Sequence, residues 1–405
     1  MRVRVIPGKA RGEITPPASK SAAHRLLLCA GLCPETSRIV APGTSDDVLA
    51  TLACLQTLGA KIHYADDTVQ ITGFDPFEKQ RNGRTLLCGE SASTMRFLLP
   101  VALLGSSTVR LQGTGSLLGR SMEPYRGLCR KQGLVFQYTD DGVEVCGPLQ
   151  PGEFRLPGNC SSQFVSGLLF ALPLLAEDSY IRLTSPLESR PYVHMTINAL
   201  LSAGILIKTV ASGDFFIPGG QHYRPIFSTV EKDWSSAAFL DALNVLGGKV
   251  VLKWLSESTG QADKIYPAYY AAVRDGAPTL PMQDCPDLAP MIMALAAANN
   301  GAVLTGTARL RLKESGRGEA MAAELRKCGA QISVEENRIA VRPGPLHQPT
   351  EILCGHNDHR IVMALAILAT RYGGVISDAQ AVQKSYPGFW HDLRRLGIRV
   401  QAEPG

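Results

Sequence analysis

The sequence has few of the features that mark membrane or secreted proteins. Its longest apolar stretch, residues 165–176, is too short to span a bilayer. The N-terminal residues 1–5 alternate charged and apolar side chains, so they resemble a strand and lack the apolar core of a signal peptide. The ten cysteines are dispersed over 405 residues without a Cys-x-x-Cys pair, which is typical of reduced thiols. We therefore expect a cytoplasmic protein.

Motifs for nucleotides, metals and serine hydrolases are also missing. Residues 113–119 contain one residue too many for the dinucleotide fingerprint, and they do not lead into a Walker loop. His356 and His359 are three positions apart but lack the further ligands that zinc requires. No Gly-x-Ser-x-Gly elbow occurs. The sequence therefore predicts neither a metal nor an organic cofactor.

The balance of charge is mild. Apolar residues make up 45% of the chain and charged residues 19%, which argues against disorder and against a coiled coil. The net charge is +5, and the basic residues are scattered instead of forming a patch or stripe. We expect this excess to serve small anions at a local site and not a nucleic acid. A chain of this length predicts two or three domains.

An internal repeat organises the chain. Six segments place small polar residues directly before an apolar stretch of helical length, and they begin at residues 19, 91, 160, 234, 286 and 357. Four of the five gaps lie between 69 and 74 residues, and the remaining gap, from residue 234 to residue 286, is 52. Such regular spacing predicts repeated supersecondary units.

A second marker falls between these helix starts. A further helix-like stretch ends in glycine and leads into a β-rich hairpin, with the glycine at position 59, 133, 204, 329 or 397. Glycine suits a helix C-terminus that needs a positive φ. Each unit is therefore predicted as strand, helix, strand, helix and hairpin, with the hairpin of the fourth unit missing.

Six such units imply two lobes of three. We expect a mixed α/β (α+β) fold in which each lobe contains three βαβαββ repeats and the fourth repeat is shortened. Residues 1–18 together with 231–405 would form the C-terminal lobe, and residues 19–230 the N-terminal lobe. The active site is expected in the cleft between them.

The predicted helix starts carry an unusual number of cations. The first turn of a helix has unpaired N–H groups and a fractional positive charge, so helix ends that converge favour anions. Ser, Asn and Asp at such positions are ordinary N-caps. Lys20, Arg25, Arg96 and Arg360 are not explained by capping, nor are Lys313 and Arg317, which we place in a loop. A phosphate or carboxylate ligand is the simplest partner for these cations.

A series of motifs resembles one family. Residues 17–25 (PASKSAAHR) are similar to the opening signature of the 5-enolpyruvylshikimate-3-phosphate synthases, and residues 89–96 (GESASTMR) resemble their second signature. Matching motifs follow in the family's order at residues 161–164, 189–192, 286–287, 313–315, 357–360 and 384–387. The resemblance spans almost the whole chain.

The resemblance implies an enzyme of the shikimate pathway, which supplies chorismate for aromatic amino acid biosynthesis. Such a 3-phosphoshikimate 1-carboxyvinyltransferase transfers the enolpyruvyl group of phosphoenolpyruvate to the 5-hydroxyl of shikimate 3-phosphate and releases phosphate. It uses no metal or organic cofactor. The expected partners are these two substrates, without nucleic acid or membrane, and we expect a monomer.

The resemblance also implies a role for each matched residue. Asp287 would take the proton of the attacking hydroxyl, and Glu314 would move the proton at the methylene carbon, with help from Lys20 and His359. The shikimate phosphate would be bound by Ser161, Ser162 and Ser189. The shikimate ring would be placed by Lys20, Ser21, Arg25, Gln163 and Lys313. Phosphoenolpyruvate would be clamped by Arg96, Arg120, Arg317, Arg360 and Lys384, and Lys384 is also counted among the catalytic residues.

Each residue also has a purely structural interpretation. Asp287 could cap its helix, and Ser161 with Ser162 could be cap and first-turn residues. Glu314 and Lys313 could form a solvated surface pair, and His359 could be a satisfied buried histidine. Their joint occurrence at the predicted helix starts, in the family's order, favours the functional interpretation.

Some positions depart from the family's pattern. Ala92 stands where many members have glycine, and we hypothesise that its methyl group narrows the phosphoenolpyruvate pocket and excludes the longer inhibitor glyphosate. Gly316 replaces a usual aspartate, and Arg309 replaces a usual asparagine or acid.

Two other functions stay open. The first is the sister enzyme that transfers enolpyruvyl to UDP-N-acetylglucosamine, which usually relies on a cysteine in the loop matching residues 117–122, where this chain has none. The second is a catalytically silent protein that binds a phosphorylated metabolite.

Overall fold

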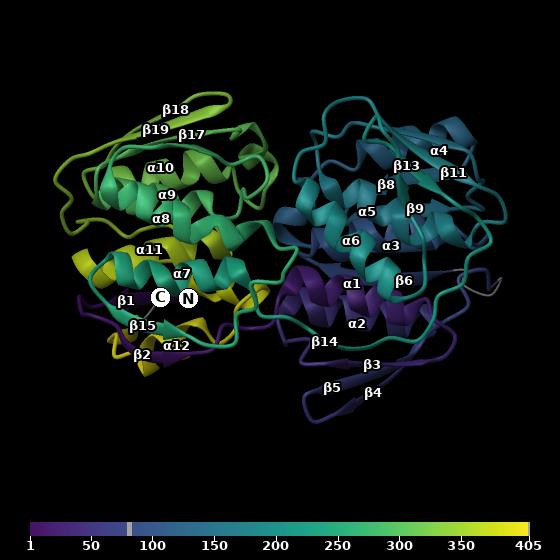
Figure 1. Ribbon diagram of the computed structural model, residues 1–405, viewed down its shortest axis with the longest axis horizontal. Helices are drawn as coiled ribbons and strands as arrows, with labels where there is room; N and C mark the ends of the chain where they lie inside the picture. The colour runs from purple at the N-terminus through teal and green to yellow at the C-terminus, as the bar shows by residue number, and fades with distance from the viewer. Residues whose placement is uncertain (79–82, 404–405) are drawn as a thin grey trace. The chain divides into compact units, whose positions relative to one another are not determined.

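The structure is a computed structural model that describes residues 1–78 and 83–403. The chain forms two compact units, one comprising Ala18–Val230 and the other Met1–Pro17 with Glu231–Gly405 (Figure 1). We call them the N-terminal unit and the C-terminal unit. Throughout the described ranges, no helix has both the length and the apolar character needed to cross a membrane.

The N-terminal unit begins with an α-helix and ends with a short strand. Its elements are α1 (Lys20–Gly31), β3 (Thr36–Val40), α2 (Asp46–Leu58), β4 (Lys61–Ala65), β5 (Thr68–Thr72), β6 (Arg84–Gly89), α3 (Ala92–Ala102), β7 (Val109–Gly113), η1 (Gly115–Leu117), α4 (Glu123–Gln132), β8 (Val135–Thr139), β9 (Gly142–Cys146), β10 (Glu153–Leu156), α5 (Ser162–Ala171), η2 (Leu172–Leu174), β11 (Ser179–Leu183), α6 (Arg190–Ser202), β12 (Lys208–Thr209), β13 (Phe215–Ile217) and β14 (Phe227–Thr229).

The C-terminal unit contains both ends of the chain. Its elements are β1 (Arg2–Val5), β2 (Arg11–Ile14), α7 (Trp234–Val245), β15 (Lys249–Leu252), η3 (Ala262–Ile265), α8 (Tyr266–Asp275), β16 (Thr279–Pro281), α9 (Ala289–Ala298), β17 (Ala302–Thr305), η4 (Ala308–Leu312), α10 (Arg317–Arg326), β18 (Gln331–Val334), β19 (Arg338–Arg342), α11 (His359–Tyr372), β20 (Gly374–Ile376), η5 (Ala379–Lys384), α12 (Phe389–Arg395) and β21 (Val400–Glu403).

Four sheets share one topology. Their strand orders are β14-β3-β5-β4, β6-β7-β9-β8, β10-β11-β13-β12 and β16-β17-β19-β18. In each of them the first two strands are parallel, and the remaining two are an antiparallel hairpin whose second strand pairs with the inner parallel strand. The mixed α/β class predicted from the sequence is confirmed.

The N-terminal segment completes two sheets of the C-terminal unit. Strand β1 lies between β20 and β21 and is antiparallel to both, so the two chain ends lie side by side (Figure 1). Strand β2 pairs in parallel with β15. Because β2 supplies the partner of β15, residues 11–14 belong in space to the fourth of the six predicted repeats. In sequence they lie more than 200 residues away from β15.

The fourth repeat has no closing hairpin in the described chain, and its sheet contains only β15 and β2. The free side of β15 is covered at one residue by a side chain. The amide of Asn244 accepts a hydrogen bond from Val250 N (2.6 Å) and donates one to Val250 O (2.8 Å). Since these are the two bonds that a neighbouring strand would make, Asn244 replaces one rung of the missing hairpin.

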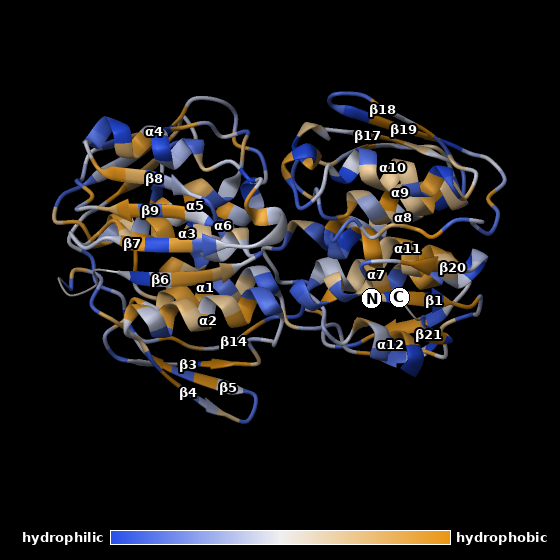
Figure 2. Ribbon diagram, turned by 180° about the vertical axis from the view of Figure 1, so that it is seen from behind, coloured by the Kyte–Doolittle hydropathy of each residue, from blue (hydrophilic) through white to orange (hydrophobic). Residues whose placement is uncertain are grey.

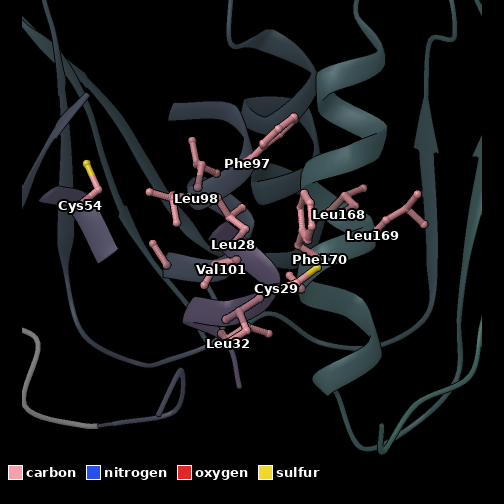
Figure 3. Close-up of a cluster of buried hydrophobic side chains, with 14 of the residues drawn as sticks. Leu28, Cys29, Leu32, Cys54, Phe97, Leu98, Val101, Leu168, Leu169 and Phe170 are labelled. Carbon is pink, nitrogen blue, oxygen red and sulfur yellow. The ribbon is translucent and has the colours of Figure 1, made fainter. Parts of the chain in front are cut away.

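Each unit has its own hydrophobic core of helices. In the N-terminal unit, α3 packs on α5, and Phe97 and Phe170 lie with their ring centroids 5.4 Å apart, next to Leu28 of α1 (Figure 3). In the C-terminal unit, α7, α9 and α11 contact one another. The ribbon of α11 is largely hydrophobic (Figure 2), and twelve of its residues from His359 to Thr370 are buried. The sheets cover these helices on the outside (Figure 1).

The predicted helix starts agree with the structure at five of six positions. Ser19, Ser91, Ser161, Asp233 and Asp358 are N-caps, and the side chain of each accepts a hydrogen bond from a backbone N–H of the first turn. All five glycines predicted at helix C-termini (positions 59, 133, 204, 329 and 397) have a positive φ.

Two helix starts differ in detail from the predictions. Pro286 and Asp287 precede the predicted apolar stretch, but the helix begins at Ala289 and its N-cap is Leu288, without a side-chain bond. The first turn falls there because it contains Pro290, which has no N–H and suits a position where that group would be unpaired. Arg317, which we placed in a loop, is the first residue of α10.

Candidate active site

Charged side chains from several segments of the C-terminal unit meet in one place. We call this group the C-terminal cluster; its members are Asp287, Lys313, Glu314, Arg317, Asp358, His359, Arg360 and Lys384. They come from the turn before α9, the segment before α10, the starts of α10 and α11, and the end of η5. Sequence reasoning had named all of them as site residues except Asp358.

Asp287 lies among three cations. Its Oδ1 accepts hydrogen bonds from Arg317 Nη1 (2.8 Å) and Lys313 Nζ (3.3 Å), and its Oδ2 accepts one from Arg360 Nη2 (3.3 Å). Burial alone would raise the pKa of Asp287, but Lys313, Arg360 and Arg317 outweigh it and hold that pKa well below its usual value. The carboxylate of Asp287 is therefore ionised. It does not cap α9, because the N-cap of that helix is Leu288.

Arg317 is held by two carboxylates. Its Nε and Nη2 bind the two oxygens of Asp358 at 2.9 and 3.1 Å, while Nη1 reaches Asp287. Although burial opposes it, the combined charge of Asp358 and Asp287 raises the pKa of Arg317. The bidentate pair fixes the plane of the guanidinium, as expected for an arginine with a positional role.

Lys313 and Glu314 point to different partners. Burial lowers the pKa of Lys313 to about 8, against the opposing attraction of Asp287. Glu314 Oε2 lies 3.0 Å from His359 Nδ1 and 3.7 Å from Lys384 Nζ. Burial opposes ionisation of Glu314, but His359 and the nearby cations hold its pKa well below the usual value. The solvated surface pair considered for Lys313 and Glu314 is therefore wrong.

Among the described residues of the C-terminal cluster, Arg360 has buried N–H donors that are not used. It is 4% exposed, and its guanidinium lies 5.6 Å from the centroid of the Phe239 ring. Besides the bond to Asp287, its Nε and Nη1 are buried and have no hydrogen-bond partner within residues 1–78 and 83–403. Burying an unpaired N–H group is costly, so these donors indicate a place for an anionic ligand.

One subset of the cluster has the composition of a metal site. Ligand atoms of Glu314, Asp358 and His359 lie within 4.8 Å of one another. Both oxygens of Asp358 already accept hydrogen bonds from Arg317, and Glu314 is bonded to His359. Because these groups neutralise one another directly, we interpret the subset as an ion-pair network and assign no metal to it.

In the N-terminal unit, Arg96 joins two of the predicted motifs. Its Nη1 donates to Gln163 Oε1 (2.9 Å) and to Ser161 Oγ (3.5 Å), and its Nη2 donates to Ser121 O (3.1 Å). Gln163 Nε2 in turn donates to Ser93 Oγ at 2.9 Å. Arg96, on α3, was predicted to bind phosphoenolpyruvate. It therefore touches two residues at the start of α5, Ser161 and Gln163, that were predicted to bind shikimate 3-phosphate.

Lys20 and Arg25 lie on α1 but bind different groups. Lys20 Nζ pairs with Asp47 Oδ2 of α2 at 2.7 Å. Arg25 is 3% exposed, and its guanidinium donates to Ser21 O, Tyr192 O and Thr196 Oγ1 at 2.6, 2.9 and 2.8 Å. The contacts of Arg25 join α1 to α6, and its contact with a shikimate ring stays a prediction.

A buried polar chain connects the first three helices. His24 Nδ1 lies 2.8 Å from Thr51 Oγ1, which lies 2.7 Å from Thr94 Oγ1, which donates to Ser91 Oγ at 2.8 Å. His24 is 1% exposed, and burial together with the charges of Lys20 and Arg25 lowers its pKa well below 6.5. The imidazole is therefore neutral, and the chain fixes the starts of α1 and α3 relative to each other.

The other predicted residues of this unit are more scattered. Ser162 is the first residue of α5, and Ser189 precedes α6 with a positive φ of 53°. Ser21 accepts the bond from Arg25 through its backbone oxygen. Arg120 is half-buried in the segment between η1 and α4, where its backbone N–H donates to Leu117 O.

Two acidic residues were missed by sequence reasoning. Asp47 stands in the first turn of α2, and Asp358 caps α11 by accepting a bond from Arg360 N (2.9 Å). Both positions have the sequence signal of ordinary first-turn or cap acids. Their pairing with Lys20 and Arg317 depends on residues 27 and 41 positions away, which no local pattern shows.

The chain is similar to one protein family over nearly its whole length. The model of the family EPSP synthase (3-phosphoshikimate 1-carboxyvinyltransferase) matches residues 5–393. The chain belongs to this family. A 3-phosphoshikimate 1-carboxyvinyltransferase of Clostridium beijerinckii is 35% identical over 422 residues and covers 98% of this chain and 97% of its own. One from Clostridium perfringens is 35% identical over 425 residues, with 99% and 100% covered.

The fold has solved counterparts as well. A structure titled EPSP synthase from Acinetobacter baumannii superposes with a TM-score of 0.79 at 23% identity and covers 99% of this chain and all of its own. The family relationship confirms the resemblance seen in the sequence motifs, and with it the reaction that this resemblance implies: an enolpyruvyl transfer from phosphoenolpyruvate to shikimate 3-phosphate in aromatic amino acid biosynthesis.

Proposed function

We propose that the C-terminal cluster binds phosphoenolpyruvate and carries out the proton transfers of the reaction. The observation that carries this proposal is the buried guanidinium of Arg360, whose Nε and Nη1 lack a partner in the described parts of the chain. A carboxylate or phosphate of the substrate could satisfy either of these donors. Lys313 and Lys384 add positive charge beside it, and Arg317 holds Asp287 in place.

Asp287 is proposed as the base for the 5-hydroxyl. Its low pKa in the free enzyme follows from the cations around it. An anionic substrate bound to Arg360 would offset part of that positive charge, so the pKa of Asp287 would rise and the carboxylate would become a better base. The hydroxyl oxygen then attacks C2 of phosphoenolpyruvate while its proton passes to Asp287.

Glu314 and His359 are proposed to share the second proton. The hydrogen bond between Glu314 Oε2 and His359 Nδ1 lets the pair carry one proton that is given to the methylene carbon. The same pair takes a proton back from the resulting methyl group as phosphate leaves, so the enolpyruvyl double bond is restored and no net proton is consumed at that carbon. Lys384, 3.7 Å from Glu314, stabilises the ionised form.

The N-terminal unit is proposed to bind shikimate 3-phosphate. The contacts of Arg96 with Ser161 and Gln163 support this assignment, because they hold the start of α5 and its N–H groups in a defined place. Ser162 and Ser189 would add donors to the phosphate, while Lys20 and Ser21 would contact the ring. Closure of the two units over both substrates, with the site in the cleft between them, belongs to this proposal.

A phosphate-release assay tests the function. Purified protein with phosphoenolpyruvate is expected to release phosphate when shikimate 3-phosphate is added and not when UDP-N-acetylglucosamine is added. Release with the nucleotide sugar alone would favour the sister transferase. Binding of shikimate 3-phosphate without any release would indicate a silent binding protein.

We also propose that the protein works in the cytoplasm. The structure describes all ten cysteines and places none of them in a disulfide, as expected in a reducing compartment. That the protein is a monomer stays a prediction.

A further inference from the structure

The segment before α11 has an unusual backbone. His356 and Asn357 have φ values of 51° and 49°, so two consecutive non-glycine residues adopt the left-handed conformation. Such conformations are costly and persist only where surrounding contacts enforce them. Gly355 precedes them at a close approach, because a Cβ there would lie 2.5 Å from Ser377 O.

This segment, residues 354–358, presents groups to the C-terminal cluster. Asn357 O accepts a hydrogen bond from Lys384 Nζ at 2.5 Å. Asp358 binds Arg317, and Arg360 follows two residues later in the first turn of α11. The positions of these three cations therefore depend on how the segment is held.

Helix α10 holds the segment at two points. Arg317, in its first turn, binds Asp358 at the end of the segment. Glu324 follows seven residues later on the same face of the helix. Its Oε2 accepts a hydrogen bond from Cys354 N at 2.7 Å, and its Oε1 lies 3.0 Å from His356 Nε2. Helix α10 therefore binds both ends of the segment through two side chains of opposite charge, Arg317 and Glu324.

Glu324 is a buried carboxylate that the reaction does not use. It is 2% exposed, and its third contact is Lys327 Nζ at 2.7 Å. Burying a carboxylate is expensive unless it is paired and hydrogen-bonded, and an apolar side chain would fill the same place at lower cost. The cost of burying Glu324 is offset by its contacts with the backbone of Cys354 and the side chain of His356 in the strained segment.

We propose that Glu324 is a positioning residue for phosphoenolpyruvate: it fixes residues 354–358 so that Lys384, Arg317 and Arg360 keep the spacing that the substrate's two anionic groups require. This inference rests on the proposed function of the C-terminal cluster. It also gives a role to His356, which fits no zinc motif and whose ring nitrogen Nε2 contacts Glu324.

The two substrates provide an internal control. Except for Lys313 and Asp287, the residues proposed for shikimate 3-phosphate, among them Ser161 and Gln163, belong to the N-terminal unit, whereas Glu324 belongs to the C-terminal unit. A defect at Glu324 should therefore change the KM of phosphoenolpyruvate and leave the affinity for shikimate 3-phosphate unchanged. A general loss of folded protein would lower kcat with both KM values constant, so the two effects can be told apart.

The test uses Glu324→Gln in the full-length enzyme, with Glu319→Gln as the matched control. Glu319 lies on the same helix, carries the same charge and is exposed. Gln keeps the size of the side chain and one acceptor but loses the charge. We expect kcat/KM for phosphoenolpyruvate to fall by roughly 10–100-fold, mainly through KM, since sub-ångström to ångström misplacement costs up to about that much. The dissociation constant of shikimate 3-phosphate, measured by calorimetry, should stay within about twofold.

Several results would overturn the inference. An unchanged KM for phosphoenolpyruvate in Glu324→Gln, as in Glu319→Gln, would show that Glu324 does not act on the cluster. An equal rise of both substrates' constants would show a general structural role. A wild-type enzyme without activity would instead refute the proposed function. His356→Gln is the second variant, and it should show the same selective rise in smaller measure, because it removes one of the two contacts with the segment.

Discussion

Replacing Asp287 by asparagine removes one negative charge from the centre of three cations, of which Arg317 and Arg360 are buried and Lys313 is half-buried. Asparagine keeps the size of the side chain and one oxygen acceptor, so Lys313, Arg317 and Arg360 lose electrostatic compensation without gaining space. The same change removes the proposed base for the 5-hydroxyl. The variant should therefore bind anions well and turn over poorly.

The magnitudes follow from the two roles. A positioned general base contributes about 10²–10⁴-fold to a rate, so kcat should fall by that factor, or about 3–5 kcal/mol on the barrier. Removing one partner of a buried ion pair costs about 3–5 kcal/mol of stability. Since the side chain of Asp287 is 21% exposed, we expect the lower end, about 3 kcal/mol, for the ligand-free variant.

Three measurements check this prediction. Phosphate release at saturating substrates gives kcat, calorimetry gives the affinity for phosphoenolpyruvate in the presence of shikimate 3-phosphate, and thermal unfolding gives stability with and without phosphate. The stabilisation by phosphate should be larger for Asp287→Asn than for the wild type, because the anion replaces the lost charge. Asp284→Asn, an exposed acid in the same segment, is the control and should behave like the wild type.

The reasoning fails if Asp287→Asn keeps kcat within tenfold of the wild type. It also fails if the variant loses affinity for phosphoenolpyruvate while its kcat is unchanged, because Asp287 would then serve binding alone.

Three further predictions concern other parts of the molecule. Ala92 is 4% exposed at the first position of α3, so Ala92→Gly should be inhibited by glyphosate more strongly than the wild type; equal inhibition constants would refute the steric hypothesis. Asn244→Ala should lower the free energy of unfolding in urea by about 1–3 kcal/mol, because it leaves the backbone groups of Val250 unpaired; an unchanged midpoint would mean that water replaces the amide. His24 stays neutral in the native state, whereas the unfolded chain binds a proton below pH 6.5, so stability should fall as the pH drops below that value. His24→Gln should make this fall shallower, and an identical slope in both proteins would contradict the assignment.

The local features of the fold were predictable because they depend on neighbouring residues. Ser19, Ser91 and Asp233 cap helices through bonds to N–H groups three residues away. The glycines that end helices need only a positive φ. Asp287 shows the limit of such reasoning. A Pro-Asp pair before an apolar stretch has the pattern of a cap, but Pro290 moves the first turn onward and leaves the carboxylate for the cations.

Contacts between distant residues were not predictable in the same way. Asn244 has the composition of an ordinary helix residue, and its role at the edge of β15 follows only from the missing hairpin. The partner of β15 comes from residues 11–14, at the other end of the chain. Sequence reasoning placed the N-terminal strand in the C-terminal lobe but could not say which strands it would pair with.

The sequence by itself determined most of the helix starts, the mixed α/β class and the family, because caps, periodicity and ordered motifs are local or additive along the chain. Only the tertiary structure decided which partners the charged side chains find: Asp47 for Lys20, Asp358 for Arg317, and the backbone N–H of Cys354 for Glu324. The physical reason is that an ion pair depends on distances of a few ångströms between residues tens of positions apart, and packing alone sets those distances.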